Sequence, residues 1–162
     1  MNPLPWLLGL VLTGCAGQGA SGIPVPPPMD LTKIERPSSP NTALFGPIGR
    51  NRQPVDLITA PYSMTSEQLY DVVKTAIAKL PNTYILADYP DRLQLHYVVR
   101  SAVLNLPDLV SVQVEVGFIP EQSLLTMYSR SVYGYYDFKV NDQRLKAWLT
   151  AIYVGTLATK ER

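Results

Sequence analysis

Two segments of the chain carry hydrophobic residues at the spacing of an amphipathic helix. The first follows Thr65, which forms a capping-box pattern with Gln68 and so predicts a helix start. Its apolar positions recur three and four residues apart and are Leu69, Val72, Val73, Ala76, Ile77 and Leu80. The second stripe begins near Val140 or Asn141 and comprises Leu145, Trp148, Leu149, Ile152 and Thr156. We therefore predict one helix that ends before Pro81 and a second helix after residue 140.

The region between these helices has the pattern of β-strands. Four runs with strand character cover residues 84–87, 93–100, 110–118 and 124–132, and apolar and polar residues alternate in the second and third. Short turns join the runs, which favours antiparallel neighbours. Residues 55–58 could add a further strand at one edge. The pattern predicts a two-layer α+β fold, in which an N-terminal and a C-terminal helix pack on a four- to five-stranded antiparallel meander sheet.

The first residues of the chain have the pattern of a signal peptide. The segment from Leu4 to Leu12 is almost entirely apolar, and it is too short to span a bilayer. The sequence from Leu12 to Cys15 (LTGC) resembles the bacterial lipobox. This resemblance implies removal of residues 1–14 and attachment of a diacylglycerol, with a further acyl chain, to Cys15. The alternative is a buried apolar segment with an incidental cysteine.

A lipidated Cys15 predicts a bacterial envelope protein whose partner is the membrane that holds its N-terminal lipid. Ala16, rather than aspartate, follows the cysteine, and by analogy with lipoprotein sorting this favours the outer membrane, facing the periplasm. Residues 15–61 are rich in proline, which predicts an extended tether. The apolar residues 43–45 indicate that the later half of this tether lies against the domain. Residues 62–162 are predicted to form a single α+β domain.

Composition and charge exclude several kinds of chemistry. The chain has 162 residues and a formal net charge of +1, which gives no electrostatic reason to expect nucleic acid as a partner. One cysteine, Cys15, and one histidine, His96, cannot supply the four ligands of a structural zinc site. The sequence has no nucleophile-elbow, zinc-protease or phosphate-cradling glycine motif. We therefore predict no metal, no cofactor and no catalytic residues, and we expect His96 to be exposed on its strand.

One segment, where the fourth predicted strand meets the second helix, combines charged and polar residues in a distinctive order. It reads Arg130, Ser131, Gly134 and Asp137, followed by Asn141 and Arg144. This spacing resembles the closing segment R-S-x-x-G-x-x-D-x-x-x-N-x-x-R of the domain-of-unknown-function 1499 family, found in bacterial envelope and plastid proteins. The resemblance extends more loosely back to the first helix. It implies a fold and a location but no reaction, because the function of the family is not established.

The chain departs from the family pattern at three places. Lys139 stands where the family usually has glycine, and Tyr136 where it usually has serine. An early cysteine-containing motif of the family is represented here only by residues 41–43 (NTA). If that cysteine serves a chemical role in the family, this chain lacks it.

The residues of this segment admit a structural and a functional interpretation. In the structural one, Gly134 permits a tight turn, Asp137 or Asn141 caps the second helix, and Arg130 pairs with Asp137 while Arg144 reaches the same corner. In the functional one, Arg130, Asp137 and Arg144 line a polar pocket for an anionic or carbohydrate ligand, and nearby tyrosines stack on it. The structural interpretation is favoured.

Three functions remain open. The leading hypothesis is a non-catalytic lipoprotein, a binding or assembly module with an envelope protein or the cell wall as partner. The second is an envelope hydrolase or transferase that uses Arg130, Asp137 and His96, since acid–base chemistry needs a titratable group in a cleft. The third is a carrier whose helices and sheet enclose an apolar ligand.

Overall fold

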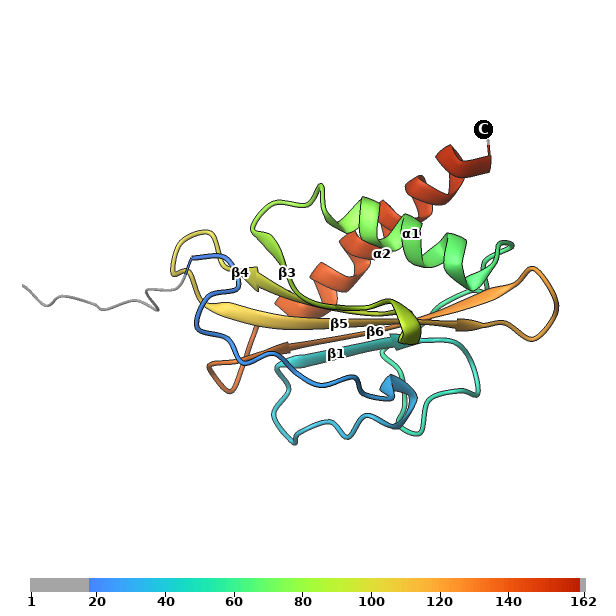
Figure 1. The fold of residues 1–162 in the computed structure, drawn as a ribbon. Coiled ribbons are helices and arrows are strands. Elements are labelled where there is room, and N and C mark those ends of the chain that lie inside the picture. Colours follow the sequence, from blue (N-terminus) through green and yellow to red (C-terminus); the bar gives the residue numbers. More distant parts are fainter. Residues whose placement is uncertain (1–17, 161–162) are drawn as a thin grey trace, which may run out of the picture.

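The structure, a computed structural model, describes residues 18–160, which contain one open, mixed sheet and two long helices (Figure 1). The strand order across the sheet is β2-β1-β6-β5-β4-β3. The strands are β1 (Thr42–Gly46), β2 (Leu57–Ile58), β3 (Thr83–Tyr89), β4 (Gln94–Arg100), β5 (Pro107–Val116) and β6 (Ser123–Ser131). The predicted signal peptide and the predicted lipidation site, Cys15, lie outside the described residues.

Both predicted helices are confirmed, and both pack on the same face of the sheet. Helix α1 (Ser66–Ile77) begins with the predicted capping box, in which the side chains of Thr65 and Gln68 each accept from the backbone N–H of the other. Helix α2 (Val140–Lys160) buries the predicted stripe of Leu145, Trp148, Ile152 and Thr156. Across from the helices, one register row of the sheet adds Phe45, Met127, Val112 and Leu95 to the core. No helix among residues 18–160 is long and apolar enough to cross a membrane.

The α+β class is confirmed, but the predicted count of four to five antiparallel strands is wrong. Strand β1 pairs antiparallel with β6, where Thr42 faces Arg130, and the short β2 pairs parallel with β1. Strand β2 lies within residues 55–58, where we expected a further edge strand. Strand β1 was not predicted as a strand, although residues 43–45 were expected to lie against the domain. Local pattern did not reveal β1 because its five buried residues do not alternate, and because its partner β6 lies far away in the sequence.

The predicted tether of residues 15–61 is wrong for the part that the structure describes. Residues 19–37, which we call the strap, cross the face of the sheet opposite the helices, as the blue segment of Figure 1 shows. The strap includes the short 3-10 helix η1 (Leu31–Lys33), in which Leu31 is fully buried against Leu44 and Tyr128. The domain therefore begins well before residue 62, and the sheet is covered on both faces.

Side chains of the sheet hold the strap by its backbone. Gln94 Oε1 accepts from the Met29 N–H and Gln113 Oε1 accepts from the Leu31 N–H, each at 2.8 Å. A third bond comes from Tyr89, the last residue of β3, whose hydroxyl donates to the Pro26 carbonyl at 2.8 Å. Proline has no N–H, so the strap cannot pair along its length as a strand would, and side-chain amides satisfy its backbone instead.

Candidate functional site

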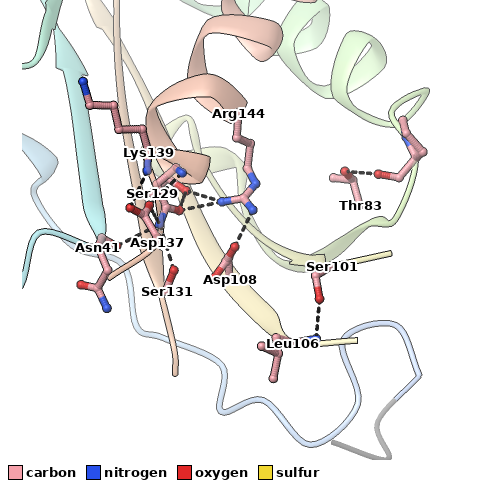
Figure 2. Close-up of polar contacts among 12 residues, drawn as sticks. Asn41, Thr83, Ser101, Leu106, Asp108, Ser129, Ser131, Asp137, Lys139 and Arg144 are labelled. Carbon is pink, nitrogen blue, oxygen red and sulfur yellow. Dashed lines mark hydrogen bonds and ion pairs between the residues drawn. The ribbon is translucent and has the colours of Figure 1, made fainter. Parts of the chain in front are cut away.

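Most of the distinctive polar residues meet where the start of α2 rests on the ends of three strands (Figure 2). We call this group the Asn141 cluster, and its members are Asn41, Asp108, Ser129, Ser131, Asp137, Asn141 and Arg144. Asp108 and Ser131 face each other in the register of β5 and β6, and Ser129 lies on the same side of β6, toward α2. The sheet register thus gathers side chains that are far apart in the sequence.

Asn141 lies at the centre of the cluster and is fully buried. Its amide Nδ2 donates to the Asn41 carbonyl at 2.9 Å, to Ser131 Oγ at 3.0 Å and to Asp137 Oδ2 at 2.7 Å. Its Oδ1 accepts from Ser129 Oγ and from the Arg144 guanidinium. Buried polar groups are costly unless they are bonded, and every polar atom of this side chain has partners within the protein.

Arg144 forms a buried ion pair with Asp108, which Figure 2 shows between α2 and β5. The two side chains are only 10% and 12% exposed. The guanidinium also donates to Ser129 Oγ at 3.1 Å and to Asn141 Oδ1 at 2.6 Å. Its donors are thus directed into the protein, where they fasten the first turns of α2 to the sheet.

Asp137 caps α2, as the structural interpretation predicted. Its carboxylate accepts from the backbone N–H groups of Lys139 at 3.0 Å and Asn141 at 2.9 Å. A carboxylate at a helix start satisfies N–H groups that lack partners and interacts favourably with the helix dipole. Gly134 has a φ of 85°, which a glycine adopts readily, and its carbonyl accepts from the Asn41 side chain.

The predicted pair between Arg130 and Asp137 is wrong. Side chains alternate along a strand, so Arg130 points away from Ser129 and lies on the strap face of the sheet. Asn41, Asp108 and Ser129 belong to the cluster but were not among the predicted site residues. The sequence pattern did not single these residues out. Asp108, for example, follows Pro107 and therefore has the pattern of a turn residue.

The strap and the sheet form a partly open cavity of about 440 Å³, on the face opposite the helices. Its walls are mainly apolar, and polar groups are few. The side chains from the sheet are Leu86, His96, Leu109, Ser111, Tyr128 and Arg130, and those from the strap are Pro26, Met29, Ile34, Glu35, Arg36 and Pro37. We call this the strap cavity. It combines a partly open volume with apolar, charged and neutral polar side chains, as many ligand sites do.

Two arginines and one glutamate contribute charge to the strap cavity. Arg36 is already engaged, because it pairs with Asp56 at 3.0 Å and donates to Thr42 Oγ1 at 3.1 Å. The carboxylate of Glu35 lies 3.7 Å from the exposed Arg52. Arg130 is exposed at the cavity and lowers the pKa of the neighbouring Tyr128 hydroxyl, although burial raises that pKa more. Arg130 is therefore the cationic group best placed to receive an anion.

His96 is not exposed, so the expectation from strand alternation is wrong. Only 1% of its surface is exposed, because the strap covers the polar face of β4. Its Nδ1 lies 2.7 Å from Ser111 Oγ, and the Tyr89 ring packs edge-on against it. Its Nε2 is buried and has no hydrogen-bond partner among residues 18–160. Burial lowers the pKa of His96 from 6.5 to about 4, so the imidazole is neutral near pH 7.

The arrangement is suited to binding more than to acid–base chemistry. A histidine with a pKa near 4 is a weak base at neutral pH, and the carboxylate that we considered for catalysis, Asp137, caps a helix on the other face of the sheet. His96 and Arg130 share the strap cavity, but Asp137 does not. Within residues 18–160, histidine and acidic side chains form no group of three that could hold a metal ion.

Comparison with known proteins shows the family of the chain. A search of curated proteins gives no match. Among solved structures, the chain is similar to one titled "Crystal structure of Ara h 8.0201", with 10% sequence identity, a TM-score of 0.44, and coverage of 61% of this chain and 94% of that one. Residues 34–152 match the family described as "Protein of unknown function (DUF1499)". Because the match covers β1 to most of α2, including the whole Asn141 cluster, the chain belongs to the domain-of-unknown-function 1499 family.

Proposed function

We propose that this chain is a lipid-anchored, non-catalytic binding module of the bacterial envelope, and that its ligand occupies the strap cavity. The ligand has an apolar body and an anionic head group, such as a carboxylate. The observation that carries the proposal is the strap cavity itself, in which mainly apolar walls stand beside the exposed guanidinium of Arg130.

The chemistry of the cavity walls supports this ligand class. Leu86, Leu109 and Ile34 offer apolar surface, and burying apolar area stabilises a complex by roughly 25 cal/mol per Å². Arg130 can donate charge-assisted hydrogen bonds to a carboxylate. His96, which lies beside Ser111, is neutral and adds no positive charge, so the attraction for an anion comes from Arg130.

The anchor is supported by the sequence from Leu12 to Cys15, which resembles a lipobox. More than one acyl chain is needed for stable membrane attachment, and a lipidated N-terminal cysteine carries two or three. The proposal places the protein at the outer membrane, facing the periplasm. The ligand and the anchor are separate parts of the proposal, and each has its own test.

The ligand is tested by calorimetric titration of the protein with dodecanoate and, in parallel, with 1-dodecanol. We expect dodecanoate to bind, and we expect Arg130→Gln to weaken this binding by about three- to tenfold, the loss of one partly exposed charge-assisted contact. Arg92→Gln is the matched control, because Arg92 is exposed and lies outside the strap cavity. Equal affinities for dodecanoate in the wild type and Arg130→Gln would count against the assigned head group, and no binding of either probe would overturn the proposed ligand.

The anchor is tested by the intact mass of the protein extracted from bacterial membranes with detergent. We expect a mature chain that starts at Cys15 and carries lipid, and we expect Cys15→Ala to lose both the lipid and the membrane association. A full-length chain without lipid would overturn the proposed location and leave the ligand test unaffected.

A further inference from the structure

Two loops at one end of the sheet expose large apolar side chains. The loop between β4 and β5 covers residues 101–106, and the loop between β6 and α2 covers residues 132–139. The loops leave the same end of the sheet from neighbouring strands, since the Val132 N–H donates to the Pro107 carbonyl at 3.3 Å. We call their exposed apolar residues the end patch, and they are Val103 (91% exposed), Leu104 (64%), Tyr135 (69%), Tyr136 (58%) and Phe138 (80%).

The folded structure holds these side chains outward. Tyr136 and Phe138 pack edge to face, with ring centroids 5.3 Å apart. Phe138 has a left-handed φ of 53°, in a turn that the Asp137 carboxylate secures through the Lys139 N–H. Single exposed apolar residues are common on proteins, but a group of this size at one end marks an interaction surface.

The described chain begins at this same end of the sheet. Arg100, which is only 5% exposed, donates to the carbonyls of Gly19 at 2.7 Å and Ser21 at 3.1 Å. The same guanidinium donates to the Asn105 carbonyl at 3.0 Å, in the loop that carries Val103 and Leu104. Figure 1 shows the described chain starting beside the loop between β4 and β5, with the loop between β6 and α2 at the same end and the hairpin between β5 and β6 at the opposite end.

The connection from Cys15 to this end is short. Gly19 is four residues after Cys15, and an extended chain spans at most about 3.5 Å per residue, so the Cα atom of Cys15 can lie no more than about 14 Å from that of Gly19. With the strap bound along the sheet, the remaining link cannot hold the domain far from the bilayer.

We infer that the end patch rests in the interface of the bilayer that holds the Cys15 lipid. This inference depends on the anchor part of the proposed function. Tyrosine and phenylalanine suit this position, because aromatic side chains with one polar edge concentrate at membrane interfaces. The loop of residues 101–106 carries no charge. The other loop contains Asp137, whose carboxylate is bonded to the backbone, and the exposed Lys139, whose long side chain can keep its ammonium at the level of the headgroups.

A fluorescent thiol label tests the inference in the full-length, membrane-processed protein. Cys15 is the sole cysteine of the chain, and a lipidated Cys15 has no free thiol. In Val103→Cys and in Phe138→Cys, a polarity-sensitive dye therefore attaches at one known place. Ile119→Cys is the matched control, because Ile119 is 62% exposed in the hairpin at the opposite end of the sheet. The labelled proteins are reconstituted into phosphatidylcholine vesicles that contain nitroxide-labelled lipid.

We expect the labels at 103 and 138 to emit at shorter wavelength, and to be quenched by the nitroxide lipid at least about twofold more than the label at 119, as burial several ångströms into the headgroup region requires. Equal quenching at all three positions, with one dye per molecule, would overturn the membrane contact while leaving the anchor intact. Two dyes per molecule would show a free Cys15 and overturn the anchor and the contact together. Protection of the label only in native envelopes, and not in vesicles, would assign the patch to a protein partner instead.

Discussion

Arg144 in α2 and Asp108 at the start of β5 form an ion pair with both side chains about nine-tenths buried. The pair joins a helix to the sheet at the point where the distinctive segment of the sequence ends. Because the guanidinium also bonds Ser129 and Asn141, the charge is compensated by a network and not by a single contact.

Removing one partner of this ion pair should destabilise the fold strongly. We expect Arg144→Met to lower the free energy of unfolding by about 3–5 kcal/mol, because it leaves the Asp108 charge buried without its partner. The double variant with Asp108→Leu should recover part of this loss. Urea unfolding measures both, with the exposed Arg92→Ala as control. A loss below about 1 kcal/mol in Arg144→Met would show that the pair is not important for stability.

Asp137 should tolerate asparagine much better than alanine. Asparagine keeps one acceptor oxygen and can still cap the Asn141 N–H, whereas alanine leaves the start of α2 uncapped, at a cost of about 1 kcal/mol. Thermal unfolding of Asp137→Asn and Asp137→Ala measures the difference. If Asp137→Asn lowered the stability as much as Asp137→Ala, then the fold would require the full carboxylate of Asp137, and a single capping bond would not be sufficient.

The backbone N–H groups of Met29 and Leu31 should exchange slowly with solvent although neither residue lies in a strand. Each donates to a glutamine side chain of the sheet, and protection reflects such bonds. We expect Gln113→Ala to abolish the protection at Leu31 and to reduce it less at Met29. Amide exchange followed by NMR reads both sites in one sample. Unchanged protection of the Leu31 N–H would mean that burial of the strap, and not the bond to Gln113, protects this group from exchange.

Stability should fall as the pH is lowered from about 6.5 to about 4, in part because of His96. Above pH 6.5 the imidazole is neutral in the folded and unfolded chains, but below it the unfolded chain takes up a proton that the folded chain, with its lowered pKa of about 4, does not. The shift corresponds to as much as about 3 kcal/mol. Urea unfolding at pH 7.5 and pH 5 should therefore show a larger loss in the wild type than in His96→Gln. The same loss in both proteins would exclude His96 as the cause.

The sequence predicted those features that depend on local pattern. The capping box at Thr65, the stripe of α2 and the alternation from Val110 onward each involve residues within a few turns or one strand of each other. Asp137 as a helix cap was predicted for the same reason.

Other features depend on which segments meet, and local pattern could not reveal them. Alternation placed His96 on the polar face of β4, but it could not show that a proline-rich segment covers that face. Asp108 joins Arg144 only because the register of β5 sets it opposite Ser131. The motif likewise grouped Arg130 with Asp137, but Asp137 lies on the helix side of the sheet with Ser131, and Arg130, the neighbour of Ser131 in β6, faces the opposite side.

The pairing of β1 with β6 sets an order of assembly opposite to the order of synthesis. Thr42 leaves the ribosome long before Arg130, the residue that it faces across the two strands. A strand cannot dock until its neighbour exists, and closing so long a loop carries an entropy cost. Strand β1 is therefore the first strand to be synthesised and among the last to pair. Until β6 is made, the unpaired backbone of β1 must not associate with another strand.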